Sequence, residues 1–540
     1  MNFTLFRYDS SQKFSVFIIL LLAIAGAICL QAGFWGKNWV LLSFVGWVFW
    51  WQAEKILEAT FTKKIFLWRL LGAFFFLLVW NVVATWWVRI TGALWVISTA
   101  NSLVMLVALI FWWWVRKFFS EKYQKWIFVP IWISFEFAHH QWQLTWVWLT
   151  LGNTFLYRNE WVQWYEYTGV WGGSLWILLM NVLFWNLKEG FSIKKIIVCA
   201  IALVVPFGFS WFLQGQKISA LQKLNVVLVQ PNIDPFTEKF SDCPRFIPFA
   251  KQAQILADLT LQKFDKTTDL VVFPETALDE NFDERLVRKY PTFQKIDSLQ
   301  KKLNVPILLG VSTRIFTKEK SSPTSQYAPL AHSYYEDFNT ALLLQKDTMF
   351  WYKKMILVPG VETIPFPEYT IFLKDFISDI GASFFLLGTG KEIINFPTPK
   401  AQVAPIICYE SMYGEFVSQF VKKGADLLCT ITNDGWLGDT QWEQHHLYLG
   451  ALRCIETRRE MLHCSNMGAS AIIDVWGKVR KEIPYNQRTA MKEIAFTYSK
   501  KTFYVCYGDF LPRIALGIVG ILFLWILANL FRKKSNNRLL

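Results

Sequence analysis

The chain has 540 residues, of which 54% are hydrophobic, and it contains 29 Trp and 48 Phe. Soluble globular proteins seldom reach these values, so the composition predicts membrane spans. The formal net charge is +14, but residues 1–214 and 509–540 hold 21 Lys and Arg against 9 Asp and Glu, whereas residues 215–508 hold 34 against 32. Because the excess surrounds the apolar segments, it argues against a nucleic-acid partner and indicates a membrane topology signal.

Apolar runs near the length of a bilayer span occur about eight times. We expect spans near residues 15–33, 38–52, 66–88, 93–115, 126–140, 168–187, 196–213 and 511–531. The second and fifth runs are short or interrupted, and the first lacks a cleavage site, so we expect it to be retained as a span. Within the fifth run, Glu136 is ionisable. It is either a functional group or a hydrogen-bonded packing group.

Lysine and arginine cluster in alternate connections between these runs. The clusters precede the first run and follow the second, fourth, sixth and eighth. Cytoplasmic loops carry such an excess. The pattern therefore predicts cytoplasmic termini, a seven-span membrane domain over 1–213, an outer domain over 214–510, and a last span with a basic tail over 511–540.

The outer segment has the pattern of a separate α/β domain. Short β-branched or Leu-rich runs predict strands at residues 224–230, 269–273, 305–311, 340–345, 403–408, 426–432 and 470–474. Helical patterns lie between several of them, near residues 245–264, 283–302, 411–423 and 441–462. Alternation of this kind predicts a layered α/β sheet, and about 300 residues suffice for one well-buried core.

The cysteines and histidines do not have the spacing of metal ligands. Cys29 and Cys199 fall in predicted spans, and an oxidising compartment would permit disulfides among the other six cysteines. The sequence has no CxxC pair and no His/Cys ligand spacing, so we expect no metal site. His445 and His446 are adjacent on a predicted helix and cannot both face one metal, so we expect them on the helix surface and in packing.

The stretch APIICYESMYGEF places Cys408 where a predicted strand ends and a helix begins. It is either a buried packing thiol or a nucleophile, whose thiolate a helix dipole would favour and whose oxyanion would lie near the Tyr409 N–H. A nucleophilic cysteine also needs a base. Glu275 in VVFPETAL follows a predicted strand, and WYKKMILVPGVE offers Lys354 and Glu362. A lysine there would lower the pKa of both the carboxyl and the thiol.

These pieces occur in the order found in a known family. The motifs are VVLVQPNI, FPETA, KKMILVP, ICYE, TNDGWLGDT and HHLYLGALRCIETRR. They resemble those of the carbon–nitrogen hydrolase (nitrilase) superfamily. With its apolar runs, the whole chain resembles the apolipoprotein N-acyltransferase family, a membrane-embedded branch of that superfamily. The resemblance implies a polytopic α-helical membrane domain joined to a nitrilase-like αββα four-layer sandwich, with no cofactor and no metal.

The motifs carry roles over to positions in this chain. Glu275 would be the general base, Cys408 the nucleophile, and Lys354 the catalytic lysine. The family pattern places that lysine three residues before the Leu of LVP, and a strand would turn Lys353 to the opposite face. The matching supporting positions are Glu362, Tyr409, Glu410 and Trp436. The chain reads LVPGVE where LVPFGE is commoner, and Phe240 lies near the place of a missing Trp.

The resemblance implies a two-step acyl transfer. Cys408 would accept a fatty acyl chain from a phospholipid as a thioester. The N-terminal α-amine of a diacylglyceryl-cysteine on an apolipoprotein would then take it. The implied partners are a phospholipid donor, a diacylglyceryl-apolipoprotein acceptor and membrane lipids, with no nucleic acid. The implied location is the bacterial inner membrane, with the catalytic domain in the periplasm.

Two other functions fit parts of the sequence. A membrane-anchored amidase or nitrilase acting on a small soluble substrate would need one anchor, so the many spans count against it. A transporter with an outer binding domain has no use for a carboxylate, a lysine and a cysteine together. Its spans would also be charged and broken by Gly and Pro, which these are not.

The segment TIFLKDFISDIGASFFLLG, residues 370–388, follows soon after Glu362 and is rich in Phe. Lys374, Asp375 and Asp379 prevent it from spanning a membrane. We expect a mobile lid over the site that enters the membrane in part. The alternative is a buried insert of the αββα fold.

Overall fold

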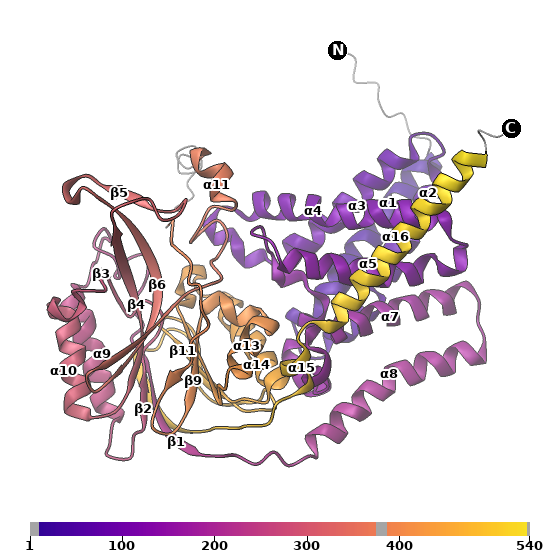
Figure 1. Cartoon of the computed structure of the whole chain (residues 1–540). Helices are drawn as coiled ribbons and strands as arrows, with labels where there is room; N and C mark the ends of the chain where they lie inside the picture. Colours follow the sequence, from indigo (N-terminus) through magenta and orange to yellow (C-terminus); the bar gives the residue numbers. More distant parts are fainter. Residues whose placement is uncertain (1–9, 374–385, 537–540) are drawn as a thin grey trace. The chain divides into compact units, whose positions relative to one another are not determined.

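The computed structural model describes residues 10–373 and 386–536 of the chain (Figure 1). These residues form two units. The helical unit comprises the described residues up to Trp142, Trp146–Leu213, and those from Asp509 onward, and the α/β unit comprises Gln143–Thr145 and Gln214–Gly508. Residues 374–385, most of the predicted lid, lie outside the described residues.

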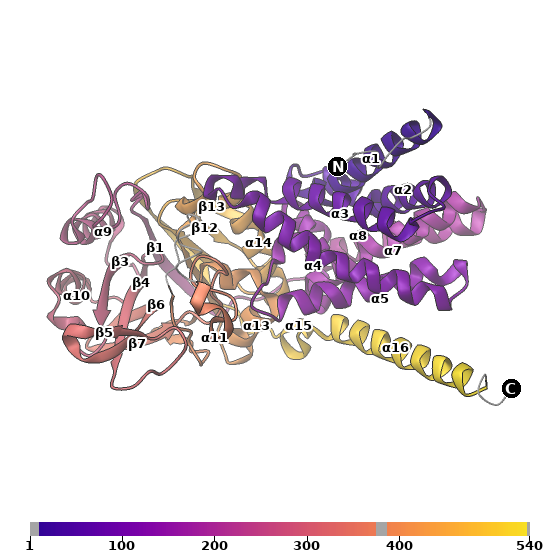
Figure 2. The ribbon, with the colours of Figure 1, turned by 90° about the horizontal axis from the view of Figure 1, so that it is seen from above.

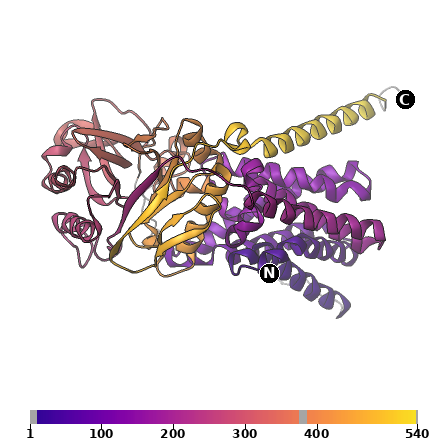
Figure 3. The same cartoon turned by 90° about the horizontal axis from the view of Figure 1, so that it is seen from below.

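The helical unit consists of α-helices joined by short 3₁₀ segments, and most of the helices run along one another (Figure 3). The α-helices are α1 (Ser10–Gln31), α2 (Gly46–Thr60), α3 (Ile65–Ala84), α4 (Leu94–Val115), α5 (Glu121–His140), α6 (Tyr165–Thr168), α7 (Val170–Glu189), α8 (Ile193–Gln214) and α16 (Phe510–Asn536). The 3₁₀ segments are η1 (Ala32–Phe34), η2 (Trp39–Val45), η3 (Trp86–Thr91), η4 (Arg116–Phe118), η5 (Val147–Leu149) and η6 (Leu151–Trp161).

Among the described residues, six helices are long and apolar enough to cross a membrane. They are Gln12–Phe34, Ile65–Ala84, Leu94–Phe118, Val170–Glu189, Ile193–Gln214 and Phe510–Arg532. Six of the eight predicted spans are thus found, and those at 38–52 and 126–140 are not among them. The segment 38–52 changes from 3₁₀ to α-helix at Gly46, and the segment 126–140, in α5, contains Pro130 and the polar Glu136.

The basic ends of several helices lie together at one end of the helical unit. Arg116 Nη2, after α4, lies 3.0 Å from Glu54 Oε1 of α2, and Lys55 Nζ of α2 lies 3.1 Å from Glu189 Oε1 of α7. Lys125 of α5 lies over the rings of Trp51, Trp112 and Trp185. The ends of α2, α4 and α7 therefore meet the start of α5. Helices α2 and α5, which are not among the six apolar helices, run alongside the others. The basic residues at the ends of α2, α4, α5 and α7 lie at the same end of the helical unit.

Glu136 is a packing group of the helical unit. Its carboxylate accepts hydrogen bonds from Ser174 Oγ (2.6 Å), Trp132 Nε1 (3.0 Å) and the backbone N–H of Leu151 (3.0 Å). Since both oxygens are bonded and the residue is buried, the carboxylate joins α5 to α7 and to η6. Of the two interpretations of this residue, the structure supports packing.

The α/β unit contains an eight-stranded and a six-stranded mixed sheet (Figures 1 and 2). The first has the order β14-β1-β2-β4-β6-β5, with β3 paired to β4 and β7 to β6. Its strands are β1 (Lys223–Gln230), β2 (Leu270–Val272), β3 (Leu278–Asp283), β4 (Ile307–Thr317), β5 (Gln326–Ala328), β6 (Ser333–Gln345), β7 (Thr348–Lys353) and β14 (Thr489–Phe496).

The second sheet has the order β13-β12-β11-β10-β9-β8. Its strands are β8 (Phe396–Pro397), β9 (Gln402–Ile407), β10 (Leu427–Thr432), β11 (Met461–Ser465), β12 (Ser470–Ile473) and β13 (Val479–Ile483). The helices of the unit are α9 (Phe249–Lys263), α10 (Pro291–Leu303), α11 (Pro367–Thr370), α13 (Gly414–Lys422), α14 (Trp442–Thr457) and α15 (Phe503–Tyr507). Its 3₁₀ segments are η7 (Val287–Lys289), η8 (Pro329–Ala331), η9 (Ile371–Leu373), η10 (Cys408–Met412) and η11 (Asp434–Leu437).

The alternation of side chains along β1 separates two apolar cores. Val226 and Leu228 join Ile406 of β9 in the core between the two sheets. Val227 and Val229 face the other way and join the residues of α9 and α10. Helices α13 and α14 cover the second sheet from its other side (Figure 1). The layers are therefore helix, sheet, sheet and helix, which confirms the predicted αββα sandwich.

The parallel strands of each sheet bring several loops to the same edge. Strands β1, β2 and β4 are parallel neighbours in the first sheet, and β9, β10 and β11 in the second. The loops after β2, β9 and β10 thus start at the carboxyl ends of parallel strands, where open α/β sheets form their binding sites. All three loops carry polar residues of the predicted motifs.

Gly310 on β4 allows the loop after β2 to approach closely. A Cβ at this position would lie 2.5 Å from the backbone N of Thr276 and 2.6 Å from Cα of Glu275. We predict that Gly310→Ala lowers the free energy of unfolding of the α/β unit by roughly 1–3 kcal/mol, because backbone must move to make room. Thermal unfolding of the purified protein in detergent measures this change.

Gly450→Ala is the matched control for this substitution. Gly450 lies within α14, and the atoms nearest to an added Cβ belong to the flexible side chain of Met461, at 3.1 and 3.8 Å. Alanine is also favoured over glycine inside a helix. The control should cost much less stability than Gly310→Ala, and equal unfolding temperatures for the two variants would contradict the prediction.

Candidate functional site

Glu275 lies in the loop after β2, and its carboxylate is fixed on both sides. Oε2 accepts a hydrogen bond from the backbone N–H of Asn433 (3.0 Å), and Oε1 accepts one from Asn339 Nδ2 (2.7 Å). The following residue, Thr276, has a φ of +45°, which turns the chain sharply away from the strand. Glu275 is only 6% exposed, so these bonds hold a buried carboxylate in one orientation.

Lys354 directly follows β7 and bonds to two carboxylates. Its Nζ lies 3.2 Å from Glu275 Oε1 and 2.8 Å from Glu362 Oε1, and the residue is 1% exposed. Burial alone would lower the pKa of this ammonium group, but the charges of the two carboxylates raise it well above its ordinary value. The neighbouring Lys353 lies elsewhere, with its Nζ 3.1 Å from Glu284 Oε1. The structure thus places Lys354, and not Lys353, beside Glu275.

Glu362 ends the loop in which this chain departs from the family pattern. Its Oε2 accepts the backbone N–H of Val358 (2.8 Å), and its own N–H donates to Val358 O (3.0 Å). Its Oε1 also accepts a hydrogen bond from Asn339 Nδ2 (3.1 Å). Gly360 has a φ of +78°, a conformation that glycine adopts without strain. The sequence LVPGVE therefore places glycine where this loop needs it and still directs Glu362 to Lys354.

Cys408 occupies a strained turn after β9. Its φ is +49°, and η10, a five-residue 3₁₀ helix, starts at the cysteine, whereas α13 starts only at Gly414. Burial raises the pKa of the thiol well above its ordinary value, and the charge of Glu275 raises it further, against the opposing effects of Lys354 and of a hydrogen bond from Thr432. The expected effect of the lysine is present, but the expectation of a lowered thiol pKa is wrong, because burial and the charge of Glu275 prevail.

Glu410 links the cysteine turn to the lysine loop. Its Oε1 accepts hydrogen bonds from Tyr352 OH (2.7 Å) and the backbone N–H of Met355 (2.7 Å), and its Oε2 accepts the backbone N–H of Ile407 (2.8 Å). The residue is fully buried, and burial raises the pKa of its carboxyl to about 7. Glu410 thus links Ile407, which precedes Cys408, to Tyr352 and Met355, which lie on either side of Lys354 in the sequence.

Tyr409 and Trp436 have different environments. Tyr409 is buried, and its ring lies edge-on to that of Tyr413, with the ring centroids 5.4 Å apart. Trp436 is partly exposed, so it is not a core residue. Its ring stacks on Phe240, with centroids 5.7 Å apart, and meets Phe236 edge-on at 5.4 Å. Phe240, which lies near the place of the missing Trp, thus contacts Trp436 of the matched motif.

Three polar residues of the site were not predicted. Asn339, in the middle of β6, donates hydrogen bonds to both Glu275 and Glu362. Asn433 donates its backbone N–H to Glu275, and Thr432 bonds to Cys408. Thr432 and Asn433 are the first two residues of the motif TNDGWLGDT, which gave a signal for this segment, whereas no local pattern marked Asn339.

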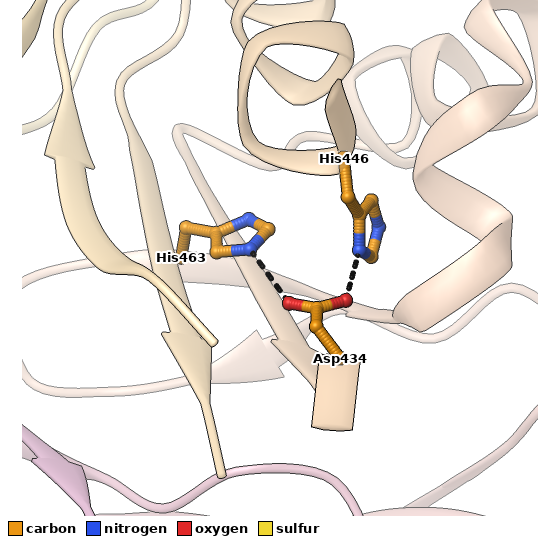
Figure 4. Close-up of side chains that lie close together, drawn as sticks. All are labelled: Asp434, His446 and His463. Atoms are coloured by element: carbon orange, nitrogen blue, oxygen red, sulfur yellow. Dashed lines mark hydrogen bonds and ion pairs between the residues drawn. The ribbon is translucent and has the colours of Figure 1, made fainter. Parts of the chain in front are cut away.

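Asp434, His446 and His463 form a buried cluster (Figure 4). This cluster adjoins the cysteine turn, since His446 Nε2 lies 3.2 Å from the backbone O of Cys408. One potential ligand atom from each residue lies within 4.8 Å of the others. Asp434 Oδ1 is 2.6 Å from His446 Nδ1, and Asp434 Oδ2 is 3.9 Å from His463 Nε2. His445 and His446 are both buried, so the packing part of their predicted role fits and the helix-surface part is wrong. Ligand spacing in the sequence missed this cluster because η11, α14 and β11 each supply one residue.

The eight cysteines, all of which lie within the described ranges, are unpaired. Cys429, Cys454 and Cys464 are buried in the core between the sheets or in the helix that covers it. The disulfides that an oxidising compartment would permit are therefore absent from this part of the fold, and apolar packing accounts for these thiols.

Two family models match the chain. The carbon-nitrogen hydrolase model matches residues 226–502, and the model of the apolipoprotein N-acyltransferase N-terminal domain matches residues 14–183. The apolipoprotein N-acyltransferase of Chlorobaculum tepidum is 31% identical over 462 residues, which cover 83% of this chain and 85% of that protein. Apolipoprotein N-acyltransferase 1 of Treponema denticola is 24% identical, and the match covers 97% of this chain and 99% of that protein.

Among solved structures, the chain is similar to Nit3 of Saccharomyces cerevisiae, a member of branch 10 of the nitrilase superfamily. The TM-score is 0.34 at 18% identity, and the match covers 52% of this chain and 93% of Nit3. Both family models follow one another along a single chain, and the C. tepidum relative matches across both. This multi-pass membrane protein therefore belongs to the apolipoprotein N-acyltransferase family of the carbon–nitrogen hydrolase superfamily.

Proposed function

We propose that the protein transfers a fatty acyl chain from a phospholipid to the N-terminal α-amine of the diacylglyceryl-cysteine of apolipoproteins, through a thioester on Cys408. The observation that carries this proposal is the buried group of Glu275, Lys354 and Glu362, of which the charges of Glu275 and Lys354 act on the Cys408 thiol. A base, a cation and a thiol are the three groups that acyl transfer through a cysteine requires. Family membership supplies the class of donor and acceptor.

In the first half-reaction, Glu275 accepts the thiol proton while the sulfur of Cys408 attacks the ester carbonyl carbon. Because the pKa of the thiol is raised, a free thiolate is unfavourable, and proton transfer accompanies the attack. The oxyanion that forms accepts hydrogen bonds from Lys354 Nζ and the Tyr409 N–H. When the ester C–O bond breaks, the lysophospholipid oxygen takes the proton from Glu275 and leaves, and the acyl group stays on the sulfur.

In the second half-reaction, the α-amine of the acceptor attacks the thioester carbonyl carbon. The nitrogen loses a proton to Glu275 as the C–N bond forms. The C–S bond then breaks, and the sulfur of Cys408 recovers that proton. The amide product leaves, and the carboxylate and the thiol return to their first state. Water must be kept from the thioester, since hydrolysis would make the enzyme a lipase.

We also propose an orientation in the membrane. The basic ends of α2, α4, α5 and α7, which lie together, belong on the cytoplasmic side by the charge rule. The α/β unit lies in the segment 214–510, between the membrane domain 1–213 and the C-terminal segment 511–540. With the basic ends on the cytoplasmic side of a bacterial inner membrane, this unit lies in the periplasm. Both lipid substrates reach it there without leaving the bilayer surface.

The first prediction concerns the acyl-enzyme. Purified protein incubated with phosphatidylethanolamine and no lipoprotein acceptor should gain one fatty acyl group on Cys408, because the second half-reaction lacks its amine. Intact and peptide mass spectrometry measures the adduct, and neutral hydroxylamine should release it as it does thioesters. Cys408→Ala should carry no acyl group. A hydroxylamine-resistant adduct, or one on Cys429 or Cys454, would contradict the assignment.

The second prediction separates the adjacent lysines. Lys354→Ala should slow acylation of Cys408 by about 10²–10³-fold, because the oxyanion loses a charged donor. Glu275→Gln should slow it by about 10²–10⁴-fold, because the base is removed. Lys353→Ala, the matched control, should be nearly normal because its ammonium pairs with Glu284. Single-turnover acylation rates measure these effects, and a Lys353 variant as slow as the Lys354 variant would overturn the assignment.

The third prediction concerns topology. Alkaline phosphatase fused after Ser535 should be inactive, whereas green fluorescent protein at the same place should fluoresce, because the C-terminus is proposed to be cytoplasmic. Phosphatase activity together with absent fluorescence would reverse the proposed orientation. The two reporters respond oppositely to compartment, so poor expression of one fusion does not imitate either result.

A further inference from the structure

The buried cluster of Asp434, His446 and His463 takes no part in the two proposed half-reactions. Asp434 and His446 are 1% and 0% exposed, and His446 comes from α14 while Asp434 begins η11 (Figure 4). Their ion pair is the short contact of 2.6 Å between Asp434 Oδ1 and His446 Nδ1. A buried ion pair is costly to desolvate, so its other contacts indicate what it does.

The hydrogen bonds around His446 determine where its protons lie. His446 Nε2 lies 3.2 Å from the backbone O of Cys408 and 2.9 Å from Ser411 Oγ, and Ser411 Oγ donates to the same Cys408 O (2.8 Å). A carbonyl only accepts, and the single hydroxyl proton of Ser411 is already used, so Nε2 must carry a proton.

The other ring nitrogen of His446 is also protonated. Asp434 Oδ1 lies 2.6 Å from Nδ1, and a carboxylate oxygen only accepts. Nδ1 must therefore donate to it. In this arrangement both ring nitrogens donate, Nδ1 to Asp434 and Nε2 to the Cys408 carbonyl and the Ser411 hydroxyl.

The Cys408 carbonyl belongs to the same peptide group as the Tyr409 N–H. A charged donor on the carbonyl oxygen polarises that peptide group, and hydrogen bonds on its two ends strengthen each other. We propose that the Asp434–His446 pair polarises and orients the Cys408–Tyr409 peptide group, and so strengthens the Tyr409 N–H as a donor to the oxyanion. His446 is thus a positioning residue. This inference rests on the proposed acyl transfer through Cys408.

Two further observations support this role. Cys408 is held at a φ of +49°, a conformation that is strained for a non-glycine residue, and two donors on its carbonyl oxygen stabilise that turn. The residue before Asp434 is Asn433, whose N–H bonds to Glu275. One short segment therefore supports both the proposed base and the peptide group beside the nucleophile.

A metal ion between Asp434, His446 and His463 is the alternative use of this cluster. A ligating nitrogen must offer a lone pair, but both nitrogens of His446 are donors in the present bonds. Metal binding would remove the proton from Nδ1 and break the 2.6 Å contact with Asp434. The two interpretations therefore make opposite demands on His446, and metal content distinguishes them.

The test compares two reactions of the same thiol. Acylation of Cys408 by phosphatidylethanolamine forms an oxyanion, whereas alkylation by iodoacetamide displaces iodide and forms none. His446→Gln should slow acylation by about 10–100-fold, part of the effect of losing one oxyanion donor. It should change the alkylation rate by less than about twofold, because Glu275 remains as base. His445→Gln, the adjacent buried histidine, is the control and should change neither rate.

A second variant covers the case in which His446→Gln does not fold. Asp434→Asn keeps the volume but removes the carboxylate that accepts from His446 Nδ1, so it should also slow acylation more than alkylation. Equal slowing of the two reactions in both variants would mean a structural role only, and unchanged acylation would mean no role. Both results overturn the inference, as does an equimolar metal ion in the purified wild-type protein.

The controls separate this inference from the proposed function. If wild-type protein forms no acyl-enzyme at all, the proposed acyl transfer is wrong. If wild-type protein is acylated on Cys408 and the His446 and Asp434 variants match it, the acyl transfer stands and the polarising role is wrong. A selective loss of acylation in both variants supports the inference.

Discussion

A single ammonium group buried between two carboxylates is the interaction on which the site depends. Lys354 Nζ bonds to Glu275 and Glu362, and Asn339 joins the two carboxylates from the other side. Burial is the largest cause of the raised pKa of the Cys408 thiol, and the charge of Glu275 adds to it, while Lys354 opposes it. Removing Lys354 would leave Glu275 and Glu362 buried with hydrogen bonds but without an opposite charge, which is costly in a protein interior.

Both sheets are needed to assemble this group. Glu275 and Lys354 follow strands of the first sheet, whereas Cys408 follows a strand of the second. Two of the hydrogen bonds that cross between the sheets lie at the site: Asn433 N–H to Glu275, and Tyr352 OH to Glu410. The sandwich therefore aligns base, lysine and thiol by backbone and side-chain bonds at the strand ends, where rigid strands limit the motion of each loop.

Much of the fold and of the candidate site could be predicted because strands and motifs are local in the sequence. Seven predicted strands correspond to β1, β2, β4, β6, β9, β10 and β12, and the motif residues Glu275, Lys354 and Glu362 lie together. Strand β11 was missed because the predicted helix extended over its start. The chain instead leaves α14 at Arg458, whose φ is +49°, and residues 461–465 form a strand.

The remaining features depend on contacts between distant segments. Asn339 is one of several polar residues of β6, so its type does not mark it, and only the sandwich brings it to two carboxylates. The ion-pair contact of His446 was not predicted, because its partner, Asp434, comes from another element. The thiol pKa was expected to fall because the sequence suggests a helix terminus, whereas the three-dimensional surroundings add burial and the charge of Glu275.

The pH dependence of Cys408 alkylation tests most directly whether Glu275 governs a protonated thiol. The rate of iodoacetamide labelling at Cys408, measured from pH 5 to 10 by peptide mass spectrometry, should rise with pH without a plateau at neutral pH. Glu275→Gln should lower the labelling rate at neutral pH. The loss of the base outweighs the loss of the carboxylate charge that repels the thiolate. A plateau below pH 7 in the wild-type protein, unchanged in Glu275→Gln, would show a preformed thiolate and contradict this account of the site.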